Sequence, residues 1–565
     1  MNFRNIPFLF LFSLLCIIAF RCAGIYPPSG GPPDTIPPAI LETFPQPSTL
    51  NFSDNHFSIS FSEYMNKQSV ENAMFVSPSL GKLEYNWSGE EVDVSFSNPL
   101  KENTTYVITI GTDAADFRER NKLKETFSLA FSTGSAIDSG KISGKVFDDK
   151  PSGVMIFAYS NRNYSFDTLS PQKISPDYIS QTGNDGTFTL DHLAKATYRL
   201  FAVRDDERNL LYDVSSNEIG VLTNDVFLED SVKDVQFRLS KEDETKPFLL
   251  SANAVSSTEI ELNFSEPIDT TRLANGKFQI INIQHRELIV RNIFPDIPSL
   301  KKIFLETQEQ TLNELYNVIV SEIFDTSGNV INETQDTASF TSANPVDTIP
   351  PSIVSLSPII ADSIRGIELQ PNILCVFNES INQKKIQTTF HLEDSTRKKV
   401  PFNLEMRTPR VVSISPNEKL KSVNWYTLSI ILDSVEDKNG LHFNDSILVR
   451  HFKTVDEKDF GILKGKVIAG ENDSAHYFVS VKNIERRNYI QQVEVNEKNE
   501  FEFDNLVQGK YVLSTFRDDD GNKKYSYGKS FPFHPSEIFT ESSDTLKVRA
   551  RWSVEGVQIT IPRSR

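Results

Sequence analysis

Four residues near the C-terminal end of the chain have the types and spacing that could bind a hard metal ion. Asp518, Asp519 and Asp520 are consecutive, and Asn522 follows after one glycine. Carboxylate and amide oxygens are the ligands that calcium prefers in proteins. We therefore predict a calcium site here, and we expect no other cofactor. The alternative stays open that this sequence is only a solvated turn, because in an EF-hand frame Phe516 would take the first ligand position.

A second group of acidic residues ends three similar strand patterns. Glu63, Glu266 and Glu379 occupy the same place in these patterns, and Asp34 and Asp347 stand beside two double prolines. Such carboxylates could line the junctions between modules and bind cations that stiffen the chain. Polar residues also end strands without any such role, so both interpretations remain.

The sequence lacks the usual signs of catalysis and of nucleic-acid binding. The eight histidines are scattered without metal-ligand spacing, and no G-x-S-x-G motif occurs. The formal net charge is −18, and no basic face is evident that would neutralise phosphates. We predict that the protein is not an enzyme and does not bind nucleic acid.

Aromatic residues between the expected strands offer another kind of chemistry, because aromatic rings stack on sugars. Glycan binding is thus an alternative function, in which the protein would be a surface adhesin or glycan-binding lipoprotein. Tyr and Trp are equally ordinary core residues of β-sandwiches. The candidate rings, expected to be exposed in loops, are Trp87, Tyr159, Tyr164, Trp425 and Tyr525.

Repeats organise the elements that must position these residues. The sequence DTIPP occurs at 34–38 and again at 347–351, and the paired motifs at 193–198 and 506–511 share the same offset of 313 residues. Two unrelated motifs with one offset indicate a duplicated block of modules. Segments such as 57–61 (FSISF) alternate strictly between apolar and polar residues, as half-buried strands do.

Three segments share one order of strand motifs. A proline-marked start is followed by 61–65 (FSEYM), 264–268 (FSEPI) or 377–381 (FNESI), then by a leucine and a tyrosine four to six residues apart, and finally by Phe-Ser-Thr or a variant. This order resembles the bacterial Ig-like domain of S-layer and outer-membrane proteins. The resemblance implies β-sandwiches at 34–135, 244–343 and 346–455, and it says nothing about a ligand.

Two further segments resemble a smaller sandwich of the prealbumin or carboxypeptidase-regulatory type. Both open alike, with ISGKV at 142–146 and LKGKV at 463–467, and both contain a long strand that runs into acidic residues, at 198–206 and 511–520. The resemblance implies modules at 139–241 and 459–565. The predicted fold class is therefore all-β, a tandem array of Ig-like and prealbumin-like β-sandwich domains.

The N-terminus is typical of an export signal. Residues 1–22 carry Arg4, an apolar stretch and then Cys22, where bacterial lipoproteins place the cysteine that receives a lipid. Arg21 departs from the usual small residue before that cysteine, so cleavage after Gly24 with release of a soluble protein is the alternative. Residues 23–33 would form a tether. The remaining cysteine, Cys375, lies in an apolar run and is expected in a core, without disulfides.

Together these features predict a signal peptide, a lipid anchor at Cys22 and a modular scaffold for protein–protein interaction. We expect the protein at the outer membrane, facing the periplasm or the cell surface, with the membrane as one partner and an unidentified envelope protein as another.

Overall fold

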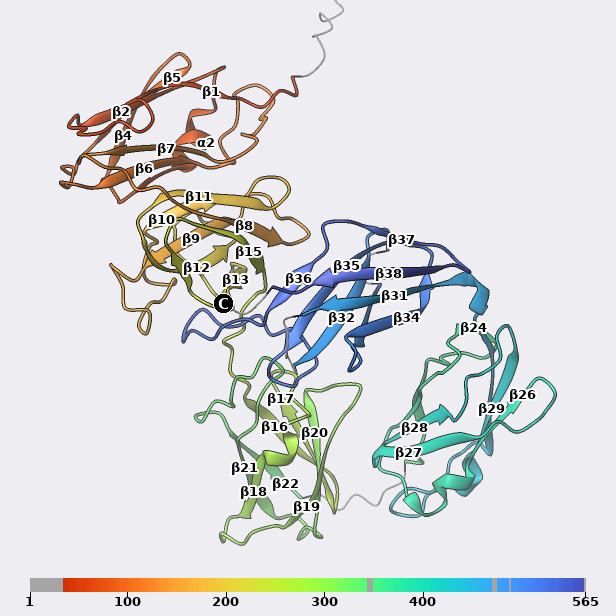
Figure 1. The fold of residues 1–565 in the computed structure, drawn as a ribbon. Helices are drawn as coiled ribbons and strands as arrows, with labels where there is room; N and C mark the ends of the chain where they lie inside the picture. The colour runs from red at the N-terminus through yellow and green to blue at the C-terminus, as the bar shows by residue number, and fades with distance from the viewer. Residues whose placement is uncertain (1–33, 343–348, 470–474, 487–488, 563–565) are drawn as a thin grey trace, which may run out of the picture. The chain divides into compact units, whose positions relative to one another are not determined.

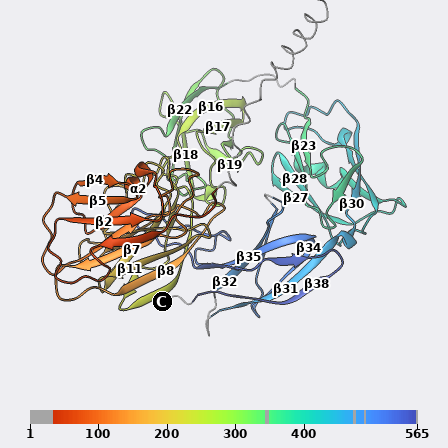
Figure 2. The ribbon, with the colours of Figure 1, turned by 90° about the horizontal axis from the view of Figure 1, so that it is seen from above.

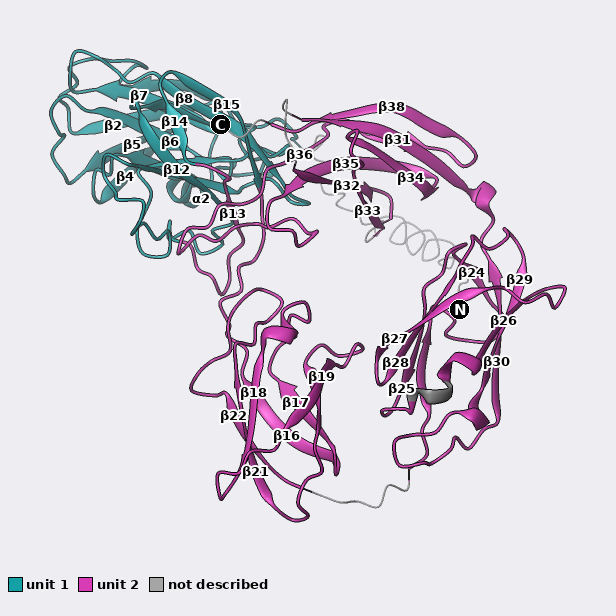
Figure 3. Ribbon diagram, turned by 60° about the horizontal axis from the view of Figure 1, so that its bottom comes forward, with its two compact units in different colours: residues 1–211, 225–237 teal, residues 212–224, 238–565 magenta. Residues whose placement is uncertain are grey.

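The computed structural model describes residues 34–342, 349–469, 475–486 and 489–562. The predicted signal peptide, the tether, Cys22 and Asp347 lie outside these residues. The chain divides into two compact units, residues 1–211 with 225–237, and residues 212–224 with 238–565 (Figure 3). Among the described residues, no helix is long and apolar enough to cross a membrane.

The first unit begins with a sandwich of two antiparallel sheets. Figures 1 and 2 both show β2 (His56–Phe61), β4 (Leu83–Ser88) and β5 (Glu91–Phe96) side by side. Strands β2 and β5 bury alternate residues, and β6 (Thr105–Ile110) buries all of its residues. Phe57, Ile59 and Tyr106 from these strands belong to one core. The short helix α2 (Lys67–Asn72) starts where the Asn66 side chain accepts the Ser69 N–H. One sheet has the order β1 (Ile40–Phe44), β2 (His56–Phe61), β5 (Glu91–Phe96), β4 (Leu83–Ser88), and the other β3 (Met74–Ser77), β6 (Thr105–Ile110), β7 (Phe127–Ser132).

The same unit continues with a second pair of sheets. Tyr198 in β12 (Ala196–Val203) is fully buried, and its hydroxyl donates to the Ala194 carbonyl at 2.8 Å. One sheet is β11 (Thr187–Leu193), β8 (Gly140–Phe147), β15 (Ser231–Arg238), and the other contains β10 (Tyr178–Gln181), β9 (Met155–Ser160), β12 (Ala196–Val203) and β14 (Val226–Leu228). Strand β13 (Ile219–Val221) falls within the segment that belongs to the second unit.

The second unit contains two sandwiches that repeat the first one's strand pattern. The first of these has the sheets β16 (Leu249–Ser256), β17 (Glu259–Phe264), β20 (Lys302–Thr307), β19 (Val290–Pro295) and β18 (Lys277–Asn282), β21 (Leu315–Ser321), β22 (Thr337–Thr341), with η1 (Leu273–Asn275). The other has β23 (Ile353–Ser357), β25 (Ile373–Phe377), β28 (Val411–Pro416), β27 (Phe402–Thr408) and β24 (Ile364–Ile367), β30 (Ile447–Thr454), β29 (Trp425–Ile431), β26 (Phe390–Asp394), with η2 (Gln383–Thr388) and η3 (Leu432–Ser434).

After η4 (Glu457–Asp459), a last pair of sheets completes the second unit. The Tyr511 hydroxyl donates to the Val507 carbonyl at 2.6 Å, the same contact that Tyr198 makes in the first unit. One sheet is β34 (Glu500–Val507), β31 (Phe460–Ile468), β38 (Ser553–Thr560). The other has β33 (Ile490–Glu494), β32 (His476–Asn483), β35 (Gly509–Asp518) and β36 (Phe539–Glu541), with β37 (Leu546–Val548) also pairing with β35.

The repeated tyrosine of the three similar sandwiches has one structural role. Tyr106, Tyr316 and Tyr426 are buried, and each hydroxyl accepts a backbone N–H five residues upstream, at 2.8, 3.1 and 2.8 Å. Each ring also stacks on the phenylalanine of the closing strand, with centroids 5.4 to 5.6 Å apart. This contact closes the corner before the strand. The prediction of an all-β tandem array of sandwiches is confirmed.

Cys375 is in strand β25, fully buried and unpaired. Its side chain belongs to the core that also contains Ile373 and Phe377. Burial raises the pKa of the thiol well above its usual value, so the group stays protonated and unreactive. Cys375 is the core residue that its apolar sequence context predicts.

Candidate metal centre

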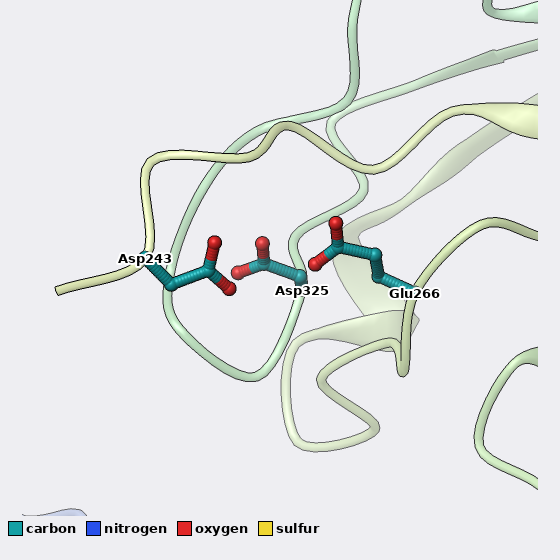
Figure 4. Close-up of side chains that lie close together, drawn as sticks. All are labelled: Asp243, Glu266 and Asp325. Carbon is teal, nitrogen blue, oxygen red and sulfur yellow. The ribbon is translucent and has the colours of Figure 1, made fainter. Parts of the chain in front are cut away.

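Three carboxylates converge at one end of the second Ig-like sandwich (Figure 4). Asp243 precedes β16, Glu266 follows β17 and Asp325 follows β21, and one oxygen from each lies within 4.8 Å of the others. They come from separate loops, which meet because β17 and β21 end on the same side of the sandwich. A cluster of this composition can hold a hard cation.

Asp325 is the fixed member of this cluster. It is 1 % exposed, and its carboxylate accepts the N–H groups of Ser327 and Asn329, both at 2.8 Å. The Asn329 amide donates to Asp325 at 3.0 Å and to the Asp243 carbonyl at 2.9 Å. The loop after β21 thus closes around Asp325 and also holds the segment that carries Asp243.

Glu266 is the member of this cluster whose pKa is raised. Burial raises the pKa of its carboxyl, and the nearby Asp243 and Asp325 raise it further, against a smaller opposite effect of Lys301. A raised pKa means that the folded state prefers the protonated acid. A bound cation would reverse this preference, because it stabilises the ionised form.

The first Ig-like sandwich has an aspartate at the position equivalent to Asp325, and it closes its loop in the same way. Asp116 is 1 % exposed and accepts the N–H groups of three residues in the loop 119–121 at 2.8 to 3.0 Å. Burial raises the pKa of Asp116, but these hydrogen bonds lower it more, so the pKa lies below its usual value. The Asn121 amide donates to the Asp34 carbonyl at 3.0 Å. Burial, followed by Asp116 and Asp34, raises the pKa of Glu63.

The third copy is described only in part, because Asp347 lies outside the described residues. Asp437 accepts the N–H groups of Asn439 and Leu441, both at 2.8 Å. It is 1 % exposed, and its Oδ2 has no hydrogen-bond partner. Leucine at 441 stands where the second copy has Asn329, whose amide satisfies the corresponding oxygen of its aspartate.

Sequence reasoning named Glu63, Glu266 and Glu379 but missed the buried aspartates of this arrangement. The spacing Asp-x-x-Gly-Asn after the tyrosine strand could have revealed Asp325, because it is typical of a turn closed by an aspartate. Asp243 precedes Pro247 by four residues, as Asp34 precedes Pro38, the second residue of the first double proline. Cation binding at these ends stays a prediction.

The predicted calcium loop at the end of β35 brings together only part of its predicted ligands. Oxygens of Asp518 and Asp520 lie within 4.8 Å of each other and of Glu537, which sequence reasoning missed. Asp519 instead forms an ion pair with Arg517, with contacts of 2.7 and 3.1 Å.

The loop also supplies its own donors to the predicted ligands. Asp518 accepts the N–H groups of Gly521 and Lys523 at 2.9 and 3.1 Å. The Asn522 amide donates to Asp520 at 2.8 Å. Gly521 has a φ of 75°, which suits the tight turn. These bonds describe a self-capped turn, and calcium binding here stays a prediction.

Glu537 is the most perturbed carboxyl of this loop. It is 4 % exposed and accepts the backbone N–H groups of Asp519 and Ser526 at 2.8 and 2.9 Å. Burial raises its pKa to about 7. The two N–H groups oppose this rise, while Asp520 and Asp518 add to it. Near neutral pH, this site therefore changes its charge.

The aromatic candidates for glycan stacking are not exposed loop rings. Tyr159 is fully buried in β9, and Trp87 and Trp425 are partly buried in β4 and β29. Tyr164 and Tyr525 do lie outside strands, but they too are partly buried. The expectation of exposed loop aromatics is wrong because the Trp87 ring packs against the core of its sandwich, and Tyr159 belongs to a strand in which every residue is buried.

Two segments of the chain match a known domain family. Residues 34–133 and 347–454 match the bacterial Ig-like domain. These are the first and third of the segments that resembled it in sequence. A search of curated proteins finds no match.

Several solved structures are similar to parts of the chain. The N-terminal part of the bacterial S-layer protein SbsC is 14% identical over 36% of this chain and 44% of its own, with a TM-score of 0.16. L,D-transpeptidase 3 from Mycobacterium tuberculosis is 13% identical over 21% and 41%, at 0.14. The chicken CNTN1 FN1–FN3 domains are 11% identical over 54% and 99%, at 0.14. The chain thus spans less than half the length of the first two, and no conclusion about ligands follows from these values.

Proposed function

We propose that the protein is a non-enzymatic lipoprotein of the cell envelope whose β-sandwich modules act as a spacer and scaffold for protein–protein interaction. Bacterial Ig-like domains are typically non-catalytic, and such sandwiches are typical of modular scaffolds. The leader, with Cys22 at its end, supports a lipid anchor at the outer membrane. The joints between modules provide the main structural support for the proposal.

The observation that best supports this proposal is the contact between the two successive sandwiches of the first unit, which we call the first joint. Gln181, at the end of β10, is 4 % exposed, and its amide donates to Asp113 Oδ2 at 2.9 Å and accepts the Asp113 N–H at 3.1 Å. Thr126 donates to the Gln181 carbonyl at 2.6 Å. Asp113 also pairs with Arg208 at 3.0 Å. Residues of two successive sandwiches thus share one polar network around the buried Gln181 side chain.

A buried network of this kind fixes orientation more strictly than apolar contact does. Each hydrogen bond has a preferred direction, and breaking one leaves a buried polar atom without a partner. Gly111 permits the close approach, because a Cβ at this position would collide with the Gln181 side chain. A joint of this construction suits a spacer that must transmit a fixed geometry.

The second unit has a comparable joint between its two Ig-like sandwiches. Glu259 at the start of β17 is 3 % exposed and is paired with Arg410, which follows β27. Ser380 donates to Glu259 at 2.6 Å, and the Arg410 guanidinium lies 3.7 Å from the Phe304 ring centroid. A buried ion pair that is also hydrogen-bonded supports a specific docking of these sandwiches.

Distances between spin labels test the spacer. Glu91 and Lys173 are exposed residues on the two sandwiches of the first unit, and each can be replaced by cysteine for labelling. We expect a narrow distance distribution that broadens when Gln181→Ala removes the network. A broad distribution in the unmodified joint would refute a stiff spacer.

Mass spectrometry of the protein from bacterial envelopes tests the anchor. We expect a diacylglycerol group on Cys22 and loss of membrane association in Cys22→Ser. A mature chain that starts at Ile25 without lipid would refute the anchor and support secretion of a soluble protein.

A further inference from the structure

Three large apolar side chains are exposed at the end of the first sandwich that follows the leader. Ile36 is 71 % exposed, Tyr64 is 63 % exposed and Phe117 is 66 % exposed. We call these three residues the apolar tip. Exposed apolar side chains grouped at one end of a module indicate a surface that is covered in use.

The backbone holds the apolar tip together. The Phe117 N–H donates to the Tyr64 carbonyl at 2.8 Å, next to the bridge between Met65 and Asp116. The Ile36 N–H donates to the Asp34 carboxylate at 2.9 Å, and the loop that Asp116 closes is bonded to the Asp34 carbonyl through Asn121. The segments that carry all three side chains are therefore anchored to each other.

The other Ig-like sandwiches of the same chain provide an internal comparison. At the position of Tyr64 they carry Pro267 and Ser380, and at the position of Phe117 they carry Thr326 and Lys438. Ser380 is buried against Glu259, and Lys438 pairs with Glu306. The fold itself does not require aromatic residues here, and only the copy next to the leader has them.

The position of the leader identifies what covers the apolar tip. Cys22 precedes Asp34 by 12 residues, and a chain spans at most about 3.5 Å per residue, or roughly 40 Å in all. An anchored protein would thus keep this end within reach of the bilayer. Tyrosine rings favour the interface between headgroups and acyl chains, and Phe and Ile favour the region below it.

The charges around the apolar tip suit an insertion that does not depend on anionic lipid. Arg118 and Arg120 alternate with Glu119 in the exposed loop, and the acidic Asp34 and Glu63 lie beside it. No net positive charge results, so apolar insertion provides the attraction.

We propose that the apolar tip inserts into the surface of the bilayer that holds the lipid anchor, so that the first sandwich stands on the membrane. This inference rests on the proposed anchor at Cys22. It assigns to the first sandwich a role in orienting the spacer that the other copies do not share.

Depth-dependent quenching tests the inference on the full lipidated chain in vesicles of phosphatidylethanolamine and phosphatidylglycerol. Glu119→Cys places a dye beside the apolar tip without removing any member, and Thr326→Cys places it in the equivalent loop of the second copy. Cys375 is fully buried and stays unlabelled. We expect spin-labelled lipids to quench the dye at position 119 and not at position 326.

A double variant, Tyr64→Ser with Phe117→Ser, completes the test. Both side chains are exposed, so the sandwich should fold, and we expect quenching at position 119 to be lost while the protein still floats with the vesicles. Two results with the unmodified apolar tip would overturn this inference but leave the lipid anchor intact. One is flotation without quenching at position 119, and the other is equal quenching at positions 119 and 326. Failure to float would refute the anchor itself and, with it, this inference.

Discussion

The raised pKa of Glu537 predicts that stability falls as the pH rises toward neutrality. In the unfolded chain this carboxyl has a pKa of about 4.5, whereas in the folded state burial raises it to about 7. Between these values the folded state binds more protons than the unfolded state, so the free energy of unfolding decreases with increasing pH. The contribution is complete below the unfolded pKa and is lost as the pH passes the folded pKa.

The magnitude follows from the size of that change. One pKa unit corresponds to about 1.4 kcal/mol, so a rise from 4.5 to about 7 is worth at most about 3 kcal/mol. Asp520, one of the two carboxylates that raise the pKa, is exposed to solvent. Screening there reduces the effect, and we expect about 1.5 to 3 kcal/mol between pH 5 and pH 8.

Glu537→Gln removes the charge and keeps the shape. At pH 5 the folded side chain is the protonated acid, whose two oxygens can both still accept an N–H group, whereas the NH2 group of glutamine cannot accept one; this difference costs about 1 to 3 kcal/mol. At pH 8 this loss is offset because the ionised carboxylate is gone. We therefore expect the variant to be less stable than the unmodified protein at pH 5 and similar to it at pH 8.

Calorimetric unfolding of the full chain from pH 5 to pH 8 measures this difference. The relevant transition is the one whose midpoint moves in Glu537→Gln, since a multidomain chain has several. Glu497→Gln, at an exposed glutamate of the same sandwich, is the matched control and should leave the pH dependence unchanged. If the same transition keeps its full pH dependence in Glu537→Gln, the assignment to this carboxyl is wrong.

Calcium provides a second result from the same experiment. An ion bound by Asp518, Asp520 and Glu537 would stabilise the folded state by about 2.7 kcal/mol at a concentration 100 times its dissociation constant. We expect the midpoint at pH 8 to rise with calcium and to stop rising in Glu537→Gln. An unchanged midpoint with and without chelator would remove this loop as a calcium site.

Three further predictions concern the joints and the other acidic cluster. Gly111→Ala forces the Gln181 side chain out of its network, and we expect a broader spin-label distribution across the first joint together with a lower unfolding midpoint. Arg410→Met leaves Glu259 buried and without its charge partner, which should cost about 3 to 5 kcal/mol in denaturant unfolding. Adding Glu259→Gln should recover most of that loss, and no recovery would show that the pair is not coupled. Glu266→Gln should flatten the decline of stability as the pH rises above 4.5, because the raised pKa of Glu266 causes that decline.

The sequence determined the fold class and the organisation of the chain. Strict alternation at 57–61 specifies a strand with one buried face, and such a pattern is local, so it can be read without knowing its partner. The repeated tyrosines also act locally, because each bonds a backbone group only five residues away. Cys375 lies in the core that its apolar neighbours predict.

Only the tertiary structure decided which polar groups meet. Asp325 and Glu266 are separated by most of a sandwich in sequence, and Glu537 reaches the acidic turn through the fold of the loop after β35. The partners of Gln181 and Arg410 come from different sandwiches. Such contacts depend on the relative position of distant loops, and no residue pattern encodes that position directly. Side-chain alternation fixes which face of a strand is buried, whereas the ends of strands are brought together by packing of the complete sandwich.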